Sequence, residues 1–469
     1  MKICTKQILT LTVCTLSVIA NSYATVHTGP IIFDNVTDTL QGGDTYVYGT
    51  GSYVFEIKNS SVVTVDPSSS GIAIKIGTEE SPLSTAYTIQ GVRVNSASTL
   101  NLGTGSFVTA YTSVTDPVFY GFAVAFANMN ADSGLNITIN GTHKGVGIIV
   151  SNSGTVDIGT DANISVSRAG LIIYQGGILE GRNSRIDARG GEGYESIGVK
   201  MMSGTVTLDN VDITSRDIGI YMATASGNYV ETVGTLNLIG GSVYSANGAA
   251  ISAQKDNPTS ETALTQTLNI SNGAQISSGA GILFSNAAAD TASDLSALTI
   301  NISDANTKVD GRIEDGMLNH TLTVKISDNA TWSSEGSSNI DQLILDNANL
   351  ELTLTDTTDS ITVGELSTSG SNDILIDFGN DFLNEITDGF MFDTDTAIII
   401  GSGEKDNINY IIADHNKDGS TWDVTDNLDG TYTITNIHVV PEPATYATIF
   451  GALALTLAAY RKRSIAPKK

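Results

Sequence analysis

Short apolar strands recur along this chain in cycles of three. One cycle contains Val156–Ile158, Ile164–Val166 and Leu171–Ile173, with Gly, Asn, Asp and Ser between the strands. Apolar and polar residues alternate within the strands, as they do when one face of a strand is buried. First strands begin near residues 137, 156, 178, 206, 236, 268, 298, 322 and 343, at spacings of 19 to 32 residues. Strands this short bury too little surface alone, so the cycle predicts a parallel β-solenoid with three strands per coil.

The alternative architecture is an antiparallel sandwich, which would show hairpin turns about every 8–12 residues. Coil length here varies mainly after the third strand, as in segments 223–234 and 252–266. A solenoid tolerates long loops at one corner because they disturb only the neighbouring coils. We expect about ten to twelve coils and, at about 4.8 Å per coil, a rod of roughly 50–60 Å.

The regular repeat is expected to span residues 136–365. Residues 25–135 are less regular, and their first part, 25–50, is predicted to cap the N-terminal end. Residues 366–440 are predicted to form a small β cap at the C-terminal end. Within it, Trp422–Val424 and Thr431–Ile434 flank Asn427–Gly430, a sequence typical of a hairpin turn.

Residues 1–24 have the three parts of a secretory signal peptide: a basic start, an apolar run and small residues before a cleavage site after Ala24. A short N-terminal membrane anchor is the alternative. Both cysteines lie in this segment, so the processed chain is expected to contain neither disulfides nor thiolate metal sites.

The C-terminal segment, 441–469, has a different tripartite pattern. Pro441-Glu442-Pro443 is followed by an uncharged stretch, Ala444–Tyr460, and then by Arg461-Lys462-Arg463. The uncharged stretch predicts a short transmembrane helix with the basic cluster on the cytoplasmic side. A simple C-terminal membrane anchor would have the same features. The three parts in this order resemble the PEP-CTERM sorting signal, which implies processing by an exosortase-type enzyme and display at the surface of a Gram-negative bacterium.

Residues 320–352 resemble the last passenger coils of pertactin-like autotransporter adhesins. The resemblance rests on the segments His320–Val324, Asn329–Trp332, Ile340–Asn347 and Leu350–Leu352. Such passengers are right-handed parallel β-helices, so the resemblance implies this handedness here. An outer-membrane barrel module does not fit in the residues given after 352, which departs from that family, so a different export route is expected.

Composition narrows the function classes. Only 16% of residues are charged, and the formal net charge is -27. Such a surface repels phosphate groups, so we expect no nucleic-acid partner.

Few residues suggest catalysis. Asp209 and Asp212, near Arg216, are the candidates for a polysaccharide lyase or glycoside hydrolase, but they also fit structural roles at Asn/Asp-rich corners. Asp132-Ser133-Gly134 partly matches a serine-protease loop, yet Ala131 replaces the usual glycine and a simple loop is favoured. We therefore predict no catalytic residues and no enzyme activity.

One segment suggests a metal site. Asp414, Asn416 and Asp418, followed by Gly419, match the opening of a calcium loop, although Thr425 replaces its closing Glu. A polar turn is the alternative, and no cofactor besides this weak calcium candidate is expected.

Aromatic residues give the remaining candidates. Tyr120, Phe122, Val124 and Phe126 alternate along one strand and are predicted to form a buried stack. The candidates for surface contacts are Tyr111, Tyr194 and Tyr229.

Together these patterns predict a secreted protein of the cell surface, outer envelope or extracellular matrix. We expect a structural or adhesive role, with an extracellular polysaccharide or a host-cell glycan as partner. A polysaccharide-active enzyme on the same scaffold and a passive surface stalk are the alternatives.

Overall fold

The computed structural model describes residues 24–48, 53–77, 89–112, 118–141, 144–189, 195–226, 232–255, 262–286, 296–316, 320–379, 382, 390–413, 422–436 and 453–455. Strands make up 67% of the structure and helix 2%, and most of the strands belong to long parallel β-sheets. The expected membrane-spanning stretch lies almost wholly outside the described ranges. Within those ranges, no helix is long and apolar enough to cross a membrane.

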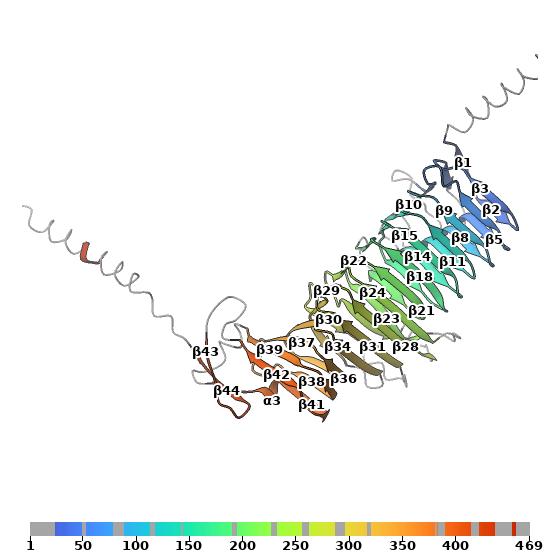
Figure 1. Cartoon of the computed structure of the whole chain (residues 1–469). Coiled ribbons are helices and arrows are strands. Elements are labelled where there is room, and N and C mark those ends of the chain that lie inside the picture. The colour runs from blue at the N-terminus through green and yellow to red at the C-terminus, as the bar shows by residue number, and fades with distance from the viewer. Residues whose placement is uncertain are drawn as a thin grey trace, which may run out of the picture.

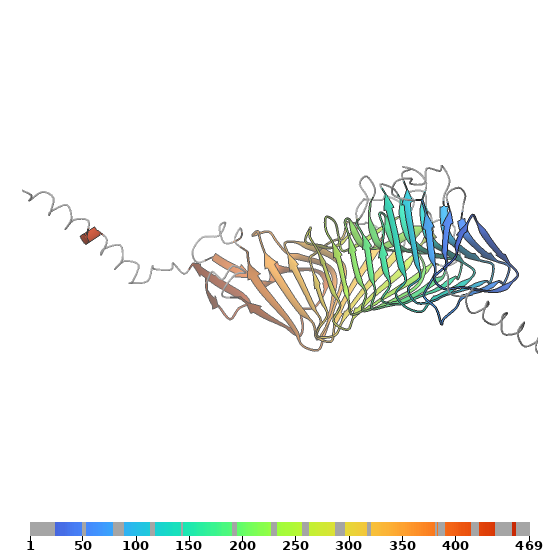
Figure 2. The ribbon, with the colours of Figure 1, turned by 90° about the horizontal axis from the view of Figure 1, so that it is seen from above.

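The chain winds through three parallel ladders, and one strand from each makes up a coil (Figures 1 and 2). Ladder A contains β2 Ile31–Asp34, β5 Tyr53–Lys58, β8 Ile89–Asn95, β11 Phe119–Ala125, β14 Gly145–Ser151, β17 Ala169–Ile173, β20 Ile197–Met201, β23 Ile218–Ser226, β26 Ile251–Lys255, β30 Ile282–Ser285 and β33 Arg312–Glu314. Ladder B contains β3 Thr37–Leu40, β6 Val62–Val65, β9 Thr99–Leu102, β12 Asn128–Ala131, β15 Thr155–Thr160, β18 Gly177–Arg182, β21 Gly204–Asp209, β24 Val233–Ile239, β28 Thr265–Ser271, β31 Ser296–Ser303 and β34 His320–Ser327.

Ladder C is the 15-stranded sheet. Its strands are β1 Val26–Thr28, β4 Thr45–Tyr48, β7 Ala73–Ile76, β10 Phe107–Thr112, β13 Asn136–Gly141, β16 Asn163–Ser165, β19 Arg185–Ala188, β22 Asp212–Ser215, β25 Ser242–Ser245, β29 Gln275–Ser278, β32 Lys308–Asp310, β35 Thr331–Glu335, β37 Asn349–Leu354, β39 Asn372–Phe378 and β42 Ile408–Ile412. At about 4.8 Å per step these strands extend about 67 Å, so the expected ten to twelve coils were too few.

Ladders A and B meet in β36 Ser338–Asp346, which pairs with both β33 and β34. Parallel pairing continues beyond it through β38 Ile361–Ser369 and β41 Ile398–Gly403, while β39 and β42 extend ladder C. Parallel strands therefore continue past residue 365, into the segment expected to be a separate cap. At the other end, β1 to β4 already pair in parallel with the next coil, within the segment 25–50 that was expected to be a cap.

A three-stranded antiparallel sheet lies in the C-terminal segment. It consists of β40 Phe390–Asp393, β44 Thr431–Asn436 and β43 Trp422–Asp426, and the short helix α3 Thr394–Ala397 follows β40. Strands β43 and β44 form the hairpin that the sequence predicted around Asn427–Gly430. A two-residue strand, β27 Thr262–Ala263, pairs antiparallel with the end of β23.

The core is a continuous column of buried Ile, Leu and Val side chains enclosed by the three ladders. Strands β15, β16 and β17 coincide with the three strands of the cycle recognised first, which confirms the three-strand cycle. The strand predicted to begin near residue 137 was wrongly assigned as a first strand. Ile137 pairs with Ile164 and therefore belongs to ladder C. The strand that precedes Val156 in ladder B is β12, where Met129 pairs with Val156. Asn residues with positive φ, such as Asn183 and Asn210, form the corners between ladders B and C.

The predicted buried stack on β11 is only half correct. Phe122 and Val124 are buried, but Tyr120 is half-exposed and Phe126 is 62% exposed. The alternation changes phase at Gly121, because Gly121 and Phe122 both face the interior. Phe126 follows the strand at a corner with φ of 53°, so its side chain leaves the core.

Candidate functional site

A regular array of threonine and asparagine covers the outer face of ladder B. Strands β24, β28 and β31 each place a Thr-x-Asn triplet there, and their registers align the triplets. We call this array the Thr/Asn face. It contains one column of Thr205, Thr235, Thr267, Thr299 and Thr323, and a second of Thr207, Asn237, Asn269 and Asn301. Side chains repeat about every 4.8 Å along each column, and the two columns lie about 6.7 Å apart along the strand direction.

The asparagine column is fixed by hydrogen bonds between coils. Nδ2 of Asn301 donates to Oδ1 of Asn269 at 2.8 Å, and Nδ2 of Asn269 donates to Oδ1 of Asn237 at 2.8 Å. Asn237 in turn donates to the hydroxyl of Thr207 at 3.3 Å. Because the amides all point one way, their dipoles add and hold the side chains in one rotamer. The face is therefore a pre-organised row of polar groups.

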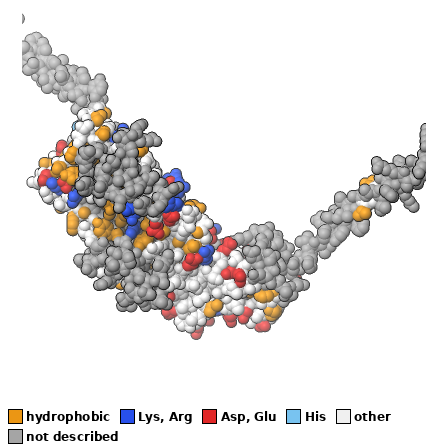
Figure 3. Space-filling view, turned by 180° about the vertical axis from the view of Figure 1, so that it is seen from behind, with side chains coloured by type: hydrophobic (Ala, Val, Ile, Leu, Met, Phe, Trp, Pro, Cys, Tyr) orange, Lys and Arg blue, Asp and Glu red, His pale blue; other side chains and the backbone are white. Residues whose placement is uncertain are grey.

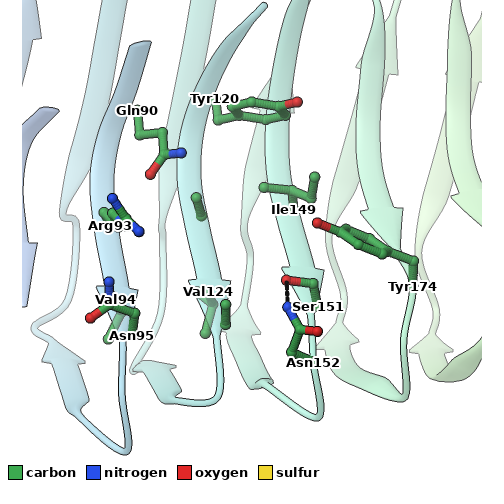
Figure 4. A pocket seen from close by; sticks show the side chains of 12 residues that line it. Gln90, Arg93, Val94, Asn95, Tyr120, Val124, Ile149, Ser151, Asn152 and Tyr174 are labelled. Carbon is green, nitrogen blue, oxygen red and sulfur yellow. Dashed lines mark hydrogen bonds between the residues drawn. The ribbon is translucent and has the colours of Figure 1, made fainter. Parts of the chain in front are cut away.

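A groove of about 350 Å³ lies on the outer face of ladder A, near the N-terminal end (Figure 4). Gln90, Arg93 and Asn95 from β8 form one side of the groove, Tyr120 from β11 lies next to Gln90 at one end, and Tyr174, directly after β17, lies on the far side. Ala123 and Ala125 lie between them on β11. Their small side chains leave the face hollow between strands that carry larger ones. We call this site the tyrosine groove.

Charge in the tyrosine groove is largely neutralised. Arg93 lies 3.6 Å from a carboxylate oxygen of Glu56, the residue beside it on β5, and Lys58 lies 3.3 Å from the other oxygen. Burial, with a smaller contribution from Tyr174, raises the pKa of Tyr120 above its ordinary value, so its hydroxyl is protonated at neutral pH. The groove is thus a polar but nearly uncharged site.

Two buried polar atoms of the groove have no hydrogen-bond partner among the described residues. They are Oε1 of Gln90 and Oδ1 of Asn95. By contrast, Ser151 and Asn152 on the opposite wall are joined by a hydrogen bond of 3.2 Å. Unpaired buried acceptors are unfavourable and favour a ligand that donates hydrogen bonds.

Next to the groove, ladder A carries a second apolar cluster outside the solenoid core. Val146, Ala169, Ile197 and Ile218 stand in one column of outward-facing residues and are at most 5% exposed. Tyr120 and Tyr174 pack against this cluster. The apolar packing fixes the side chains that line one wall of the groove.

The three residues considered for catalysis each contact a different partner. Asp209 lies beside Arg182 of the preceding coil, and Asp212 accepts a hydrogen bond of 2.6 Å from Ser242. Arg216 donates from Nε and Nη2 to the adjacent Asp217. Arg216 is therefore ion-paired with Asp217, and the two candidate acids, Asp209 and Asp212, lie against residues of neighbouring coils.

Other candidates lie at corners or outside the described ranges. The Ser133 hydroxyl lies at a corner and donates to that of Thr104 at 3.4 Å. Tyr111 is half-buried on β10. The calcium candidates Asp414, Asn416 and Asp418, the sorting-motif residues, Tyr194 and Tyr229 fall outside the described residues. Across the described part of the chain, no three His, Cys, Asp or Glu side chains are grouped to hold a metal ion.

Surface charge is unevenly distributed. Seen from behind, Lys and Arg side chains gather toward the N-terminal half, and the C-terminal part carries mainly Asp and Glu (Figure 3). Neither the Thr/Asn face nor the tyrosine groove was found from sequence. The recurring Thr-x-Asn triplets were a visible signal for the first, whereas the second joins residues from several coils.

Comparison with known proteins adds no relative. No protein-family model matches the chain, and no curated protein is significantly similar to it.

Proposed function

We propose that this chain is an exported bacterial surface or matrix protein that adheres to an extended glycan polymer. Its scaffold in this proposal is a right-handed parallel β-helix with a small C-terminal cap. The observation that carries the proposal is the Thr/Asn face, in which the same hydrogen-bonding groups recur in register on successive coils. A polymer with repeating hydroxyl groups can meet such a surface at many equivalent points.

Rigidity strengthens this argument. The asparagine amides are already ordered by their bonds at 2.8 Å, so little side-chain entropy is lost when a ligand binds. Each contact is weak, but contacts linked along one chain act together and raise the overall affinity. The position of the array on a solenoid face, rather than on loops, gives the long straight track that a polymer needs.

The proposal includes export and sorting. Cleavage after Ala24 removes the signal peptide, and the segment from Pro441-Glu442-Pro443 to Arg461-Lys462-Arg463 holds the chain in the membrane through its C-terminal helix. An exosortase-type enzyme then processes this segment and releases the protein to the cell surface. The support for these steps is the order of motifs in the sequence.

The test is a binding screen of the purified protein against insoluble polysaccharides and a glycan array, with product release followed in the same wells. We expect saturable binding that the double variant Thr267→Ala/Thr299→Ala weakens at least tenfold. The matched control is Thr109→Ala/Thr138→Ala, which removes two aligned threonines from ladder C. New reducing ends or unsaturated products would instead support a hydrolase or lyase, and a complete absence of binding would support a passive stalk.

A further inference from the structure

The tyrosine groove is a second candidate binding site, distinct from the Thr/Asn face and on a different ladder. Its volume of about 350 Å³ falls near the lower end of the range for small-ligand pockets, about 300–1,000 Å³. The floor is made by Ala123 and Ala125 on a central strand, not by a loop. The groove is therefore a permanent feature of the scaffold with room for a small ligand.

The polar groups of the groove select for a hydrogen-bond donor. Gln90 Oε1 and Asn95 Oδ1 are buried acceptors without a partner among the described residues, and an unpaired buried acceptor is unfavourable. A ligand that donates hydrogen bonds to both would recover this loss. Amide side chains also have donor groups, so a ligand hydroxyl, which both donates and accepts, is the best match.

Charge argues against an anionic ligand. Arg93 is the charged side chain among the described lining residues and lies 3.6 Å from Glu56. Lys58, 3.3 Å from the same carboxylate, also lies 3.8 Å from Asp34, so the two cations are matched by two acids. Glu56 itself is only 8% exposed, so its negative charge remains close to the guanidinium and is poorly screened by water. A carboxylate or phosphate entering the groove would meet this acid as well as the arginine.

Two tyrosine side chains also give the groove surfaces that suit a sugar ring. Tyr120 lies at one end of the groove beside Gln90, and Tyr174 points its hydroxyl back toward the groove from the side opposite β8 (Figure 4). A tyrosine offers an apolar ring for C–H groups and a hydroxyl for hydrogen bonding. A pyranose ring has both kinds of surface, with C–H groups on its faces and hydroxyls around its edge.

We propose that the tyrosine groove binds an uncharged pyranose unit of a glycan, with the rings of Tyr120 and Tyr174 against the sugar and Gln90 and Asn95 accepting from its hydroxyls. This site does not depend on the polymer-binding role of the Thr/Asn face. The groove recognises one sugar unit, whereas the face contacts many repeats weakly.

The test measures binding of neutral methyl hexosides to the full-length protein by ligand-observed NMR and calorimetry, with glucuronic acid as the anionic probe. We expect saturable binding of at least one neutral hexoside and at least tenfold weaker binding of glucuronic acid. Ala123→Leu fills the floor and should weaken hexoside binding at least tenfold. Ala297→Leu adds the same side chain on the outer face of ladder B and should leave binding unchanged.

Tyr174→Ser provides a second variant, because it removes a ring outside the solenoid core and should also abolish binding. Circular dichroism and thermal unfolding of each variant verify that it is folded. Failure of every neutral hexoside to bind, unchanged binding in folded Ala123→Leu and Tyr174→Ser, or a preference for glucuronic acid would overturn the proposal. Binding of the same variants to insoluble polymers separates this site from the Thr/Asn face. Polymer binding should be weakened by Thr267→Ala/Thr299→Ala and not by the groove variants.

Discussion

A column of glycines follows ladder A where it passes close to ladder C. Its members are Gly91, Gly121, Gly147, Gly170, Gly198 and Gly219, and Ala250 occupies the next place. A Cβ added to any of these glycines would lie 2.5–2.7 Å from the carbonyl oxygen of the next member. Their φ angles are not in the left-handed region, so close approach, not backbone conformation, requires glycine here.

The substitution Gly198→Ala gives the sharpest measure of this packing. The new methyl would lie 2.2 Å from Cγ2 of Ile213 and 2.5 Å from the oxygen of Gly219. Carbon atoms in favourable contact are about 3.5–4.0 Å apart, so the neighbours would have to move by more than about 1 Å. Ile213 is fully buried, and the oxygen belongs to the backbone of the adjacent coil. Overpacking of this kind costs about 1–3 kcal/mol, and we expect about 3 kcal/mol because neither neighbour can yield freely.

Urea unfolding followed by far-ultraviolet circular dichroism tests this expectation. Gly198→Ala should unfold at a clearly lower urea concentration than the unaltered protein. The matched control is Gly316→Ala, whose added methyl would contact, among the described residues, Oδ1 of Asn286 at 3.7 Å and should change stability by less than about 0.5 kcal/mol. Equal midpoints for Gly198→Ala and Gly316→Ala would refute the close-approach argument.

Three further predictions concern polar groups. Burial and, less strongly, Asp395 raise the pKa of Tyr410 to about 12, and its buried hydroxyl has no partner among the described residues, so Tyr410→Phe should leave thermal stability unchanged or increase it. Asp217 has a lowered pKa because, although burial raises it, bonds from Arg216 and Ser196 outweigh that effect. The stabilisation by Asp217 is complete above pH 3.8, its ordinary pKa, and is lost as the pH falls through the lowered pKa. The loss of stability caused by Asp217→Asn, measured by urea unfolding, should therefore become smaller at acidic pH. The Thr25 N–H donates to Oδ1 of Asp44 at 2.8 Å, and cleavage after Ala24 would make this group an ammonium. Asp44→Asn should therefore destabilise the processed chain by about 1.5 kcal/mol more than the unprocessed chain, as thermal unfolding of both forms would show.

The sequence predicts the solenoid well because its signal is local and repeated. Alternation in Val156–Ile158 and Leu171–Ile173 places apolar side chains inside, and the structure confirms both strands. The hairpin at Asn427–Gly430 was also predictable from its turn residues. Such features depend on a few neighbouring residues and need no knowledge of distant parts of the chain.

The N-terminal coils were harder to predict because local alternation breaks there. On β11, Gly121 and Phe122 both face inward, so a period of two that starts at Tyr120 assigns that residue to the wrong face. Phe126 has φ of 53°, a conformation unusual for a bulky residue, and no local pattern would place it at a corner. Coils with such interruptions escape a period search, which explains why fewer coils were expected than the 15 strands of ladder C.

The proposed binding surfaces depend on a different property, the register between coils. Thr205, Thr235, Thr267, Thr299 and Thr323 are separated by 30, 32, 32 and 24 residues, yet they form one column. The segments between the strands differ in length, and this accounts for the unequal sequence separations. A search for a fixed period in the sequence therefore does not reveal that these threonines are aligned. Changing the length of such a segment leaves the column intact, because hydrogen bonding of the strands sets the register. A single residue inserted within β28 would instead turn Thr267 and Asn269 toward the core, since side chains alternate between faces with a period of two. The proposed binding surfaces therefore depend on strand register and the fold depends on alternation, so alternation can be recognised in one sequence whereas the surfaces require the structure.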